Sequence, residues 1–399
     1  MLTALIIFLL TYLVLAIGRL PGFRLDRSGA AIIGAALMIA TGALSMQQAQ
    51  AGVDYRTIML LFGMMIVVAN LRISGFFTLV SAWVVERTRR PIVLLSAIVF
   101  VSGLFSAFFV NDTMCLVLTP LVIDITRRLR RNPVPYLLAL AMAANIGSVA
   151  TITGNPQNMM IGSFSGISYR AFAAALAPIA VVGLVVLIAL AALIYRGEFR
   201  QETVMAIEHH PVTIDRVQLW KSLLISFAMI AFFFAGSPVA EVAFIAGALL
   251  LISRRVEPET IYREIDWPLL VMFVGLFIVV AGVDQTSLSK ELLRSAARFQ
   301  LGNTAILSAA TAVLSNVVSN VPAVLIFKPV VGHLADPRHA WLVLAMSSTL
   351  AGNLTVLGSV ANLIVVERAR KEVSISFWEY AKLGVPVTLV TLAIGVVLL

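Results

Sequence analysis

FVNDTMCLVLTP, from Phe109 to Pro120, places asparagine, aspartate and threonine between two apolar segments of this chain. A related stretch, SNVPAVLIFKP from Ser319 to Pro329, recurs in the second half. Lipid offers no partner to the backbone groups of such a turn, and each unsatisfied group costs several kcal/mol. A duplicated polar turn therefore indicates a ligand-binding site at membrane depth.

The composition is that of an integral membrane protein. Of the 399 residues, 60% are hydrophobic and 12% are charged, and the mean hydropathy is +0.99. No soluble domain of this length could bury so much apolar surface. The single cysteine, Cys115, excludes a disulfide framework and an all-cysteine metal site.

The net charge of +9 also has a membrane explanation. The arginines lie in short clusters between apolar runs, such as Arg127/Arg128 and Arg254/Arg255, and cytoplasmic loops of membrane proteins carry such an excess. We therefore predict a lipid bilayer and not a nucleic acid as the partner. The clusters predict the plasma membrane, as in a bacterial inner membrane, with both termini outside.

Ten segments have the apolarity and the length, roughly 20 residues, of membrane spans. They are 2–20, 28–48, 56–73, 136–165, 171–195, 220–235, 238–253, 266–283, 339–367 and 377–398. Two further apolar segments, 92–128 and 303–335, are too long for one span and hold the polar turns at their centres. We predict that both are re-entrant hairpins, preceded by the amphipathic stretches 76–90 and 286–300.

The same motifs follow one another in both halves, for example Gly154-Asn155-Pro156-Gln157-Asn158 and Gly358-Ser359-Val360-Ala361-Asn362. With five spans in each half, the second copy is expected to lie upside down relative to the first. The predicted fold is an all-α integral membrane protein with two inverted repeats of five transmembrane helices, each with one re-entrant hairpin and one discontinuous helix. The first repeat is 1–195, the cytoplasmic linker is 196–219, and the second repeat is 220–399.

The discontinuous helices are predicted at 136–165 and 339–367, where glycine, proline and polar residues interrupt the apolar sequence. Each break should leave helix ends near the middle of the membrane, where an N-terminus attracts anions and a C-terminus attracts cations. Asparagine amides at the breaks and hairpins suit a hydroxylated solute or an oxyanion, although some must satisfy broken backbone. The predicted substrate-binding residues are Asn111, Thr113, Gly154, Asn155, Asn158, Asn320, Gly358, Ser359 and Asn362.

Ionisable residues at membrane depth are costly unless they are paired or functional. Asp112 lies at the first hairpin turn, and the matched residue of the second turn is Val321. Asp112 is predicted to couple transport to an ion, by carrying a proton or helping to hold sodium; its alternative is a helix cap. Lys328 could complement an anionic substrate, pair with Asp112 or extend to the membrane interface.

These motifs resemble those of the ion transporter superfamily, and within it the arsenite permease-like branch of arsenical and silicic acid efflux permeases. The similarity lies in the two hairpin motifs around Asn111 and Asn320 and in the unwound-helix motifs 145–158 and 357–362. It implies a scaffold domain, a mobile transport domain that carries both hairpins, a homodimer, and ion coupling without nucleotide hydrolysis. Related members are credited with arsenite, silicate, dicarboxylates or sodium–proton exchange.

The predicted function is secondary active transport of a small oxyanion or hydroxylated metalloid of the arsenite, antimonite or silicate type, proton-coupled and of the elevator type. With one cysteine, a three-thiolate arsenic site cannot be built, so arsenite would bind as As(OH)3. The alternatives are a sodium–proton antiporter and a sodium-coupled carboxylate or anion transporter. We predict no enzyme activity, metal or cofactor, because no histidine or cysteine grouping suggests one.

Overall fold

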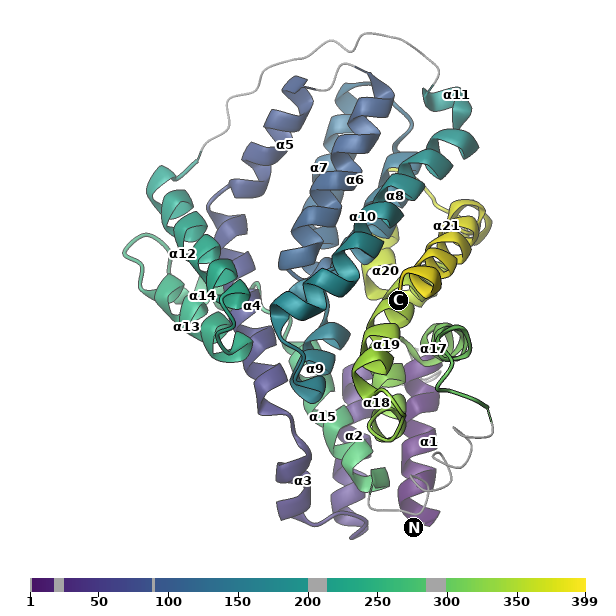
Figure 1. Cartoon of the computed structure of the whole chain (residues 1–399). Helices are drawn as coiled ribbons and strands as arrows, with labels where there is room; N and C mark the ends of the chain where they lie inside the picture. The colour runs from purple at the N-terminus through teal and green to yellow at the C-terminus, as the bar shows by residue number, and fades with distance from the viewer. Residues whose placement is uncertain (1, 18–24, 88–89, 200–213, 285–298) are drawn as a thin grey trace.

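The computed structural model describes all residues except 1, 18–24, 88–89, 200–213 and 285–298 (Figure 1). The described residues of the first half form helices only: α1 Leu2–Ile17, α2 Arg27–Ala40, α3 Met46–Gly52, α4 Tyr55–Ile73, α5 Phe76–Arg87, α6 Pro91–Phe108, α7 Asn111–Arg128, α8 Pro133–Ser148, η1 Ile152–Gly154, α9 Pro156–Ser165, α10 Tyr169–Ile194 and α11 Arg196–Phe199.

The second half repeats this order within its described residues. Its helices are α12 Arg216–Phe234, α13 Val239–Leu251, α14 Pro258–Tyr262, α15 Trp267–Asp284, α17 Thr304–Val318, α18 Asn320–Val331, α19 Pro337–Ala351, η2 Val356–Gly358, α20 Val360–Ala369 and α21 Phe377–Leu398. The all-α fold is thus confirmed. The upside-down relation of the two halves stays a prediction.

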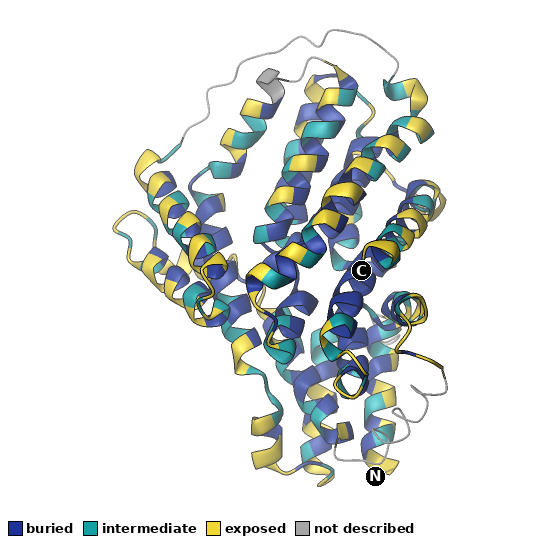
Figure 2. Ribbon diagram, viewed as in Figure 1, coloured by how far each residue is buried: buried dark blue, intermediate teal, exposed yellow. Residues whose placement is uncertain are grey.

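Membrane-compatible helices are found in both halves. Among the described residues, α4, α6, α10, α12, α15 and α21 are each long and apolar enough to cross a bilayer. Large apolar side chains on these helices are exposed, for instance Phe227 of α12 and Val397 of α21. Figure 2 shows exposed residues along α10, α12 and α21. Exposed apolar faces of this extent are those that lipid covers.

The hairpins and discontinuous helices have short, well-defined breaks. Phe109 and Val110 join α6 to α7, and Ser319 alone joins α17 to α18. Each predicted discontinuous helix consists of two α-helices with a 3-10 turn between them, α8–η1–α9 in the first half and α19–η2–α20 in the second.

The prediction of one continuous span over 28–48 is wrong. Helix α2 ends at Ala40, and Gly42 adopts a left-handed conformation with a φ of 69°. Ser45 then starts α3 with a capping box, in which its hydroxyl and the Gln48 side chain each satisfy a backbone N–H. The predicted amphipathic stretch 286–300 lies, up to residue 298, outside the described residues.

The helices form two groups. In the group that we call the framework bundle (α1–α4 and α12–α15), α4 packs on α13 and α2 packs on α15. In the hairpin bundle (α6–α10 and α17–α21), α6 packs on α8, α17 on α19, and α10 on α21. Figure 1 shows α1, α2 and α15 at the lower end of the molecule and α6–α8 at the upper end.

Glycines allow the framework helices to approach closely. A Cβ at Gly63 of α4 would lie 2.5 Å from the carbonyl carbon of Ala243 in α13. The corresponding Gly275 of α15 would place a Cβ 2.6 Å from the carbonyl carbon of Ala31 in α2. Each contact joins a helix of the first half to one of the second, so the two halves are interleaved in space.

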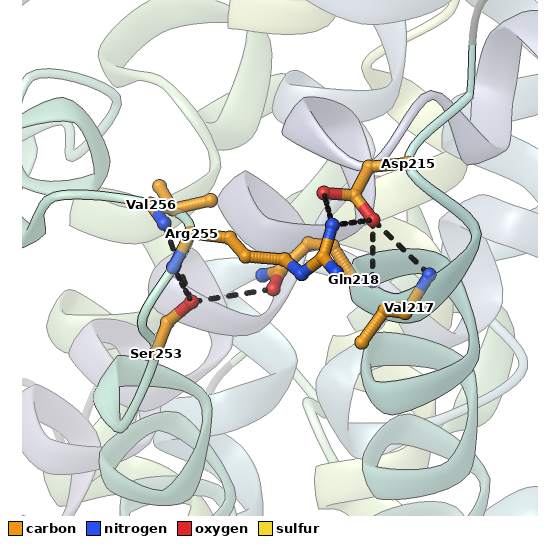
Figure 3. A network of polar contacts seen from close by, with 6 residues as sticks. All are labelled: Asp215, Val217, Gln218, Ser253, Arg255 and Val256. Carbon is orange, nitrogen blue, oxygen red and sulfur yellow. Dashed lines mark hydrogen bonds and ion pairs between the residues drawn. The ribbon is translucent and has the colours of Figure 1, made fainter.

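A polar network fixes the start of α12 to the framework bundle (Figure 3). Asp215 accepts hydrogen bonds from the backbone N–H groups of Val217 and Gln218, and Arg255 forms an ion pair with it at 3.1 Å. The Gln218 amide donates to Asn70 Oδ1 of α4 at 2.8 Å. The start of α12, at residues 215–218, is therefore attached both to α4 and to the segment that follows α13.

Candidate functional site

Four helix N-termini meet at one cavity. It has a volume of about 800 Å³, and its lining includes the first residues of α7, α9, α18 and α20, namely Asn111, Pro156, Asn320 and Val360. The framework bundle supplies the opposite wall through the ends of α1, α2 and α15. The cavity thus lies between the two bundles, at the level of both hairpin turns.

The N-termini of the hairpin helices differ from those of the broken helices. Asn155 caps α9 and Ser359 caps α20, whereas within the described residues no side chain caps α7 or α18. Ser319, which precedes α18, has a φ of 78°, a conformation that is costly for a residue other than glycine. Uncapped N–H groups at a helix start are ready to bind an anion or another oxygen ligand.

Asn145 of α8 is the centre of a buried amide network. Its Oδ1 accepts hydrogen bonds from Asn111 Nδ2 and Ser359 Oγ, both at 3.0 Å. Its Nδ2 donates to the Oδ1 atoms of Asn353 and Asn362, both at 2.9 Å. One side chain therefore joins the first hairpin to the broken helix of the second half.

A second network supports the other hairpin. Asn155 Nδ2 and Gln157 Nε2 both donate to Thr349 Oγ1 at 3.1 Å. With its amide oriented to satisfy its neighbours, Asn320 donates to the Ser348 carbonyl at 3.0 Å and accepts from Gln157 Nε2 at 3.2 Å. The second hairpin is thus joined to the broken helix of the first half.

Asn158 and Asn362 donate hydrogen bonds to backbone carbonyls at the two helix breaks. Asn158 Nδ2 donates to the carbonyls of Ser148 and Thr151, both at 3.0 Å. Asn362 Nδ2 donates in the same way to Gly352 and Thr355, at 2.6 and 3.0 Å. These bonds satisfy carbonyls that a continuous helix would have paired internally.

Glycine is required at both breaks. A Cβ at Gly154 would lie 2.1 Å from the Ser148 carbonyl oxygen, and one at Gly358 would lie 2.8 Å from the Gly352 carbonyl oxygen. Only a residue without a side chain lets the backbone fold back so closely.

The predicted substrate-binding residues therefore occupy two shells. Asn111, Asn320 and Ser359 line the cavity, as does Asp112. Thr113 lines a smaller adjoining hollow of about 60 Å³. The other five do not line the cavity and instead support its wall: Gly154, Asn155, Asn158, Gly358 and Asn362.

Three residues to which the sequence analysis assigned no role now belong to the site: Asn145, Gln157 and Thr349. Asn145 and Thr349 precede Gly154 and Gly358, respectively, by the same spacing. That equivalence was the available signal. Asn145 carries an amide and Thr349 a hydroxyl, so a comparison of residue types does not reveal that the two positions are equivalent.

Asp112 is the second residue of α7 and faces both hollows. Its carboxylate interacts with the backbone N–H of Ala361 at the start of α20 and lies within electrostatic range of Asp266. Among the described arginines and lysines, none forms an ion pair with Asp112. Its counterpart in the second hairpin, Val321, lines the same cavity without a charge.

Lys328 lies outside the cavity in this structure. Its Nζ is 4.3 Å from the ring centroid of Phe164, at the end of α9. Phe164 also contacts the rings of Phe277 and Trp341. Lys328 therefore packs against an aromatic cluster and does not line the cavity.

Comparison with known proteins places the chain in a family. The family model for citrate transporters, CitMHS, matches residues 6–351. The chain belongs to this family. It is therefore a membrane transporter and not an enzyme.

Individual relatives cover nearly the whole chain. A 46 kDa membrane protein of Mycobacterium leprae (strain TN) is 31% identical, over 98% of this chain and 96% of the relative. The silicon efflux transporter LSI3 of Oryza sativa subsp. japonica is 30% identical, over 95% of this chain and 93% of the relative.

A solved structure shares the fold. The crystal structure of the Alcanivorax borkumensis YdaH transporter, described as having an unusual topology, superimposes with a TM-score of 0.59 at 16% identity. The match covers 100% of this chain and 96% of that chain. At this identity the likeness concerns the fold alone.

Proposed function

We propose that this transporter is a secondary active carrier of a small oxyanion or hydroxylated metalloid of the arsenite, antimonite or silicate type. The observation that carries the proposal is the convergence of four helix N-termini, two of them uncapped, on one cavity. Their N–H groups donate hydrogen bonds, and the helix dipoles favour negative charge or oxygen lone pairs.

Polar side chains also line the cavity, namely the amides of Asn111, Asn320 and Gln157 and the hydroxyl of Ser359. Their hydrogen bonds to the buried networks hold them in place, and the resulting polar wall suits a ligand with several oxygens. Cys115 is fully buried and does not line the cavity, so thiolate chemistry has no part in binding. An arsenite substrate would accordingly be recognised as As(OH)3.

We assign ion coupling to Asp112. A carboxylate that moves through a membrane without a cationic partner is costly, and protonation removes that cost. Asp112 lies at the cavity wall with no ion pair to a described residue, so it is placed to exchange a proton with the cavity. The coupling ion in the proposal is therefore a proton.

The proposed movement is of the elevator type. The cavity separates the hairpin bundle from the framework bundle, so a displacement of one against the other would carry the hairpin tips across the membrane. The cavity lining includes Arg27 and Arg370, which belong to arginine clusters that the proposal assigns to the cytoplasmic side. This conformation would then face inward, with both termini outside and a homodimer formed through the framework.

Sodium-coupled carboxylate transport is the second candidate. It is favoured by the cavity volume of about 800 Å³, which exceeds the needs of a four-oxygen solute, and by the family's citrate transporters. Sodium–proton antiport would instead use Asp112 with no organic or metalloid substrate.

Flux into proteoliposomes distinguishes these functions. Purified protein would be tested with arsenite, silicate, citrate and succinate, first under an imposed proton gradient and then under a sodium gradient. Proton-driven movement of arsenite or silicate is the expected result. Movement of carboxylates with sodium, or of sodium alone, would replace the proposed substrate and retain the fold.

A further inference from the structure

The framework wall of the cavity carries an arginine that has no partner among the described residues. Arg27 is the first residue of α2, is half-buried, and lines the cavity. No hydrogen bond or ion pair joins its guanidinium to any residue that the structure describes. A partly buried guanidinium that faces a cavity without an ion-pair partner among the described residues is available to bind an anionic ligand.

Two acidic residues that line the cavity from the framework side, Asp26 and Asp266, already accept hydrogen bonds from other groups. Asp26 Oδ1 accepts from the Gly29 N–H and Asp26 Oδ2 from the Ser28 hydroxyl, both at 2.8 Å. Asp266 accepts from the Leu269 N–H at 3.0 Å, at the start of α15. Both carboxylates thus cap helices of the framework bundle, and neither forms an ion pair with Arg27.

Arg370 provides an internal contrast. It lines the same cavity, but it is exposed and lies 3.7 Å from Glu367 in an ion pair. The two arginines of the cavity wall therefore differ in whether an ion-pair partner already occupies the guanidinium. Arg370 already has a carboxylate partner, whereas Arg27 has none among the described residues.

We propose that Arg27 selects anionic substrates, by pairing with two oxygens of one anionic group held between it and the uncapped N-termini of α7 and α18. This deepens the proposed function and rests on it. A guanidinium donates two parallel N–H hydrogen bonds that match the geometry of a carboxylate or oxyanion. A neutral hydroxylated solute can accept these bonds but adds no charge attraction. Within the proposed substrates, Arg27 would favour an oxyanion with at least two oxygens on one centre over a neutral hydroxylated solute.

Arg27 also makes this selection dependent on conformation. It belongs to the framework bundle, whereas the helix N-termini opposite belong to the hairpin bundle. A bound anion touches both bundles only when the hairpin tips face Arg27. The anion therefore stabilises the conformation seen here relative to any in which the bundles have moved apart.

The test uses the full-length protein in detergent and in proteoliposomes, with Arg27→Gln, Arg27→Lys and the matched control Arg370→Gln. Binding of citrate, succinate and phosphate is followed by thermal stabilisation, and flux of citrate and arsenite by uptake. Arsenite is neutral at neutral pH, so it reports binding that does not depend on charge.

We expect Arg27→Gln to raise the apparent Kd for anions by about tenfold, which is about 1.4 kcal/mol. Arg27→Lys should recover part of this loss, because it keeps the charge without the planar fork. Arg370→Gln should leave anion affinity within about twofold, since that charge is exposed and paired. Arsenite uptake should fall by a smaller factor than anion affinity in the Arg27 variants, because a neutral solute gains no charge pairing from the guanidinium.

Two results would overturn the role of Arg27. One is equal anion affinity in Arg27→Gln and the wild type; the other is an equal loss for citrate and arsenite. A wild type that carries arsenite and binds no anion would also refute it, while leaving the proposed function intact. Conversely, Arg27-dependent anion binding without flux of any tested oxyanion or metalloid would refute the proposed function alone.

Discussion

The two hairpin tips share a backbone arrangement and differ in chemistry. In both, an asparagine begins the second helix, that helix has no side-chain cap within the described residues, and an amide network links it to the broken helix of the other half. The first tip, however, adds Asp112 where the second has Val321. The two tips thus share a backbone arrangement, and at these matched positions only the first tip carries a titratable side chain.

The helices behind the tips differ as well. Gly103 and Gly147 let α6 and α8 touch directly, since a Cβ at Gly147 would lie 2.1 Å from the Gly103 carbonyl oxygen. In the second half, Asn316 lies between α17 and α19 and donates to the carbonyls of Ala312 and Ala351, at 3.0 and 2.9 Å. The corresponding helix pairs are therefore held together differently: α6 and α8 by direct backbone packing, and α17 and α19 by the Asn316 amide.

The largest effect is expected for Gly147→Ala. The added Cβ would meet backbone atoms of α6, which cannot rotate away, so the cost should reach about 3 kcal/mol or more. Size-exclusion chromatography and thermal unfolding in detergent would measure the loss of folded protein. Gly332→Ala is the control, because nothing lies within 4 Å of a Cβ at that position. Wild-type stability in Gly147→Ala would show that α6 and α8 are not packed as described.

Asp112→Asn should abolish proton-driven accumulation while leaving folding and substrate exchange intact. The amide preserves size and hydrogen bonding but cannot change charge during the crossing. Uptake under a proton gradient and counterflow without a gradient would be measured side by side. Val321→Asn, at the matched position, should keep proton-driven uptake. Full coupled uptake in Asp112→Asn would remove the functional distinction between the two tips.

Asn145→Ala should lower the free energy of unfolding more than Thr349→Ala. Asn145 bonds with four other side chains, so its loss orphans several buried groups and should cost about 2 kcal/mol. Thr349 joins only Asn155 and Gln157, and its loss should cost about 1 kcal/mol. Thermal unfolding of both variants measures the difference. Equal costs would argue that the two networks are energetically equivalent.

The smallest effect is expected away from both tips, at Asp215. The backbone N–H of Gln218, and next to it Arg255, hold the pKa of Asp215 below its ordinary value of 3.8. Because the folded-state pKa is lowered, this stabilisation is present above pH 3.8 and is lost as the pH falls through the folded-state value. The melting temperatures of the wild type and Asp215→Asn should differ slightly at neutral pH and converge in acid. A constant difference would contradict an ionic origin.

Much of the fold was accessible from the sequence, because its signals are local. The predicted hairpin 92–128 corresponds to α6 and α7, over Pro91–Phe108 and Asn111–Arg128. Apolar length, proline and glycine act on neighbouring residues and so can be recognised in order along the chain. The error at 28–48 arose from the same cause, since the short break around Gly42 is embedded in an apolar run.

The candidate site was only partly accessible. Asn111, Asp112, Asn320 and Ser359 were predicted and line the cavity. The central role of Asn145 could not be predicted, because three of its four side-chain partners lie in the other half of the chain. Lys328 could not be placed either, since its position over Phe164 depends on how α18 packs beside α9.

The sequence by itself determined that this is a membrane protein with two polar hairpin turns, two interrupted helices and a lone carboxylate at one turn. Those properties follow from composition and from the backbone limits of proline and glycine, which need no distant partner. Only the tertiary structure decided that four helix N-termini open into one cavity and that Arg27 lines it without an ion pair to any described residue. These relations depend on packing between segments far apart in the chain, which no local pattern specifies.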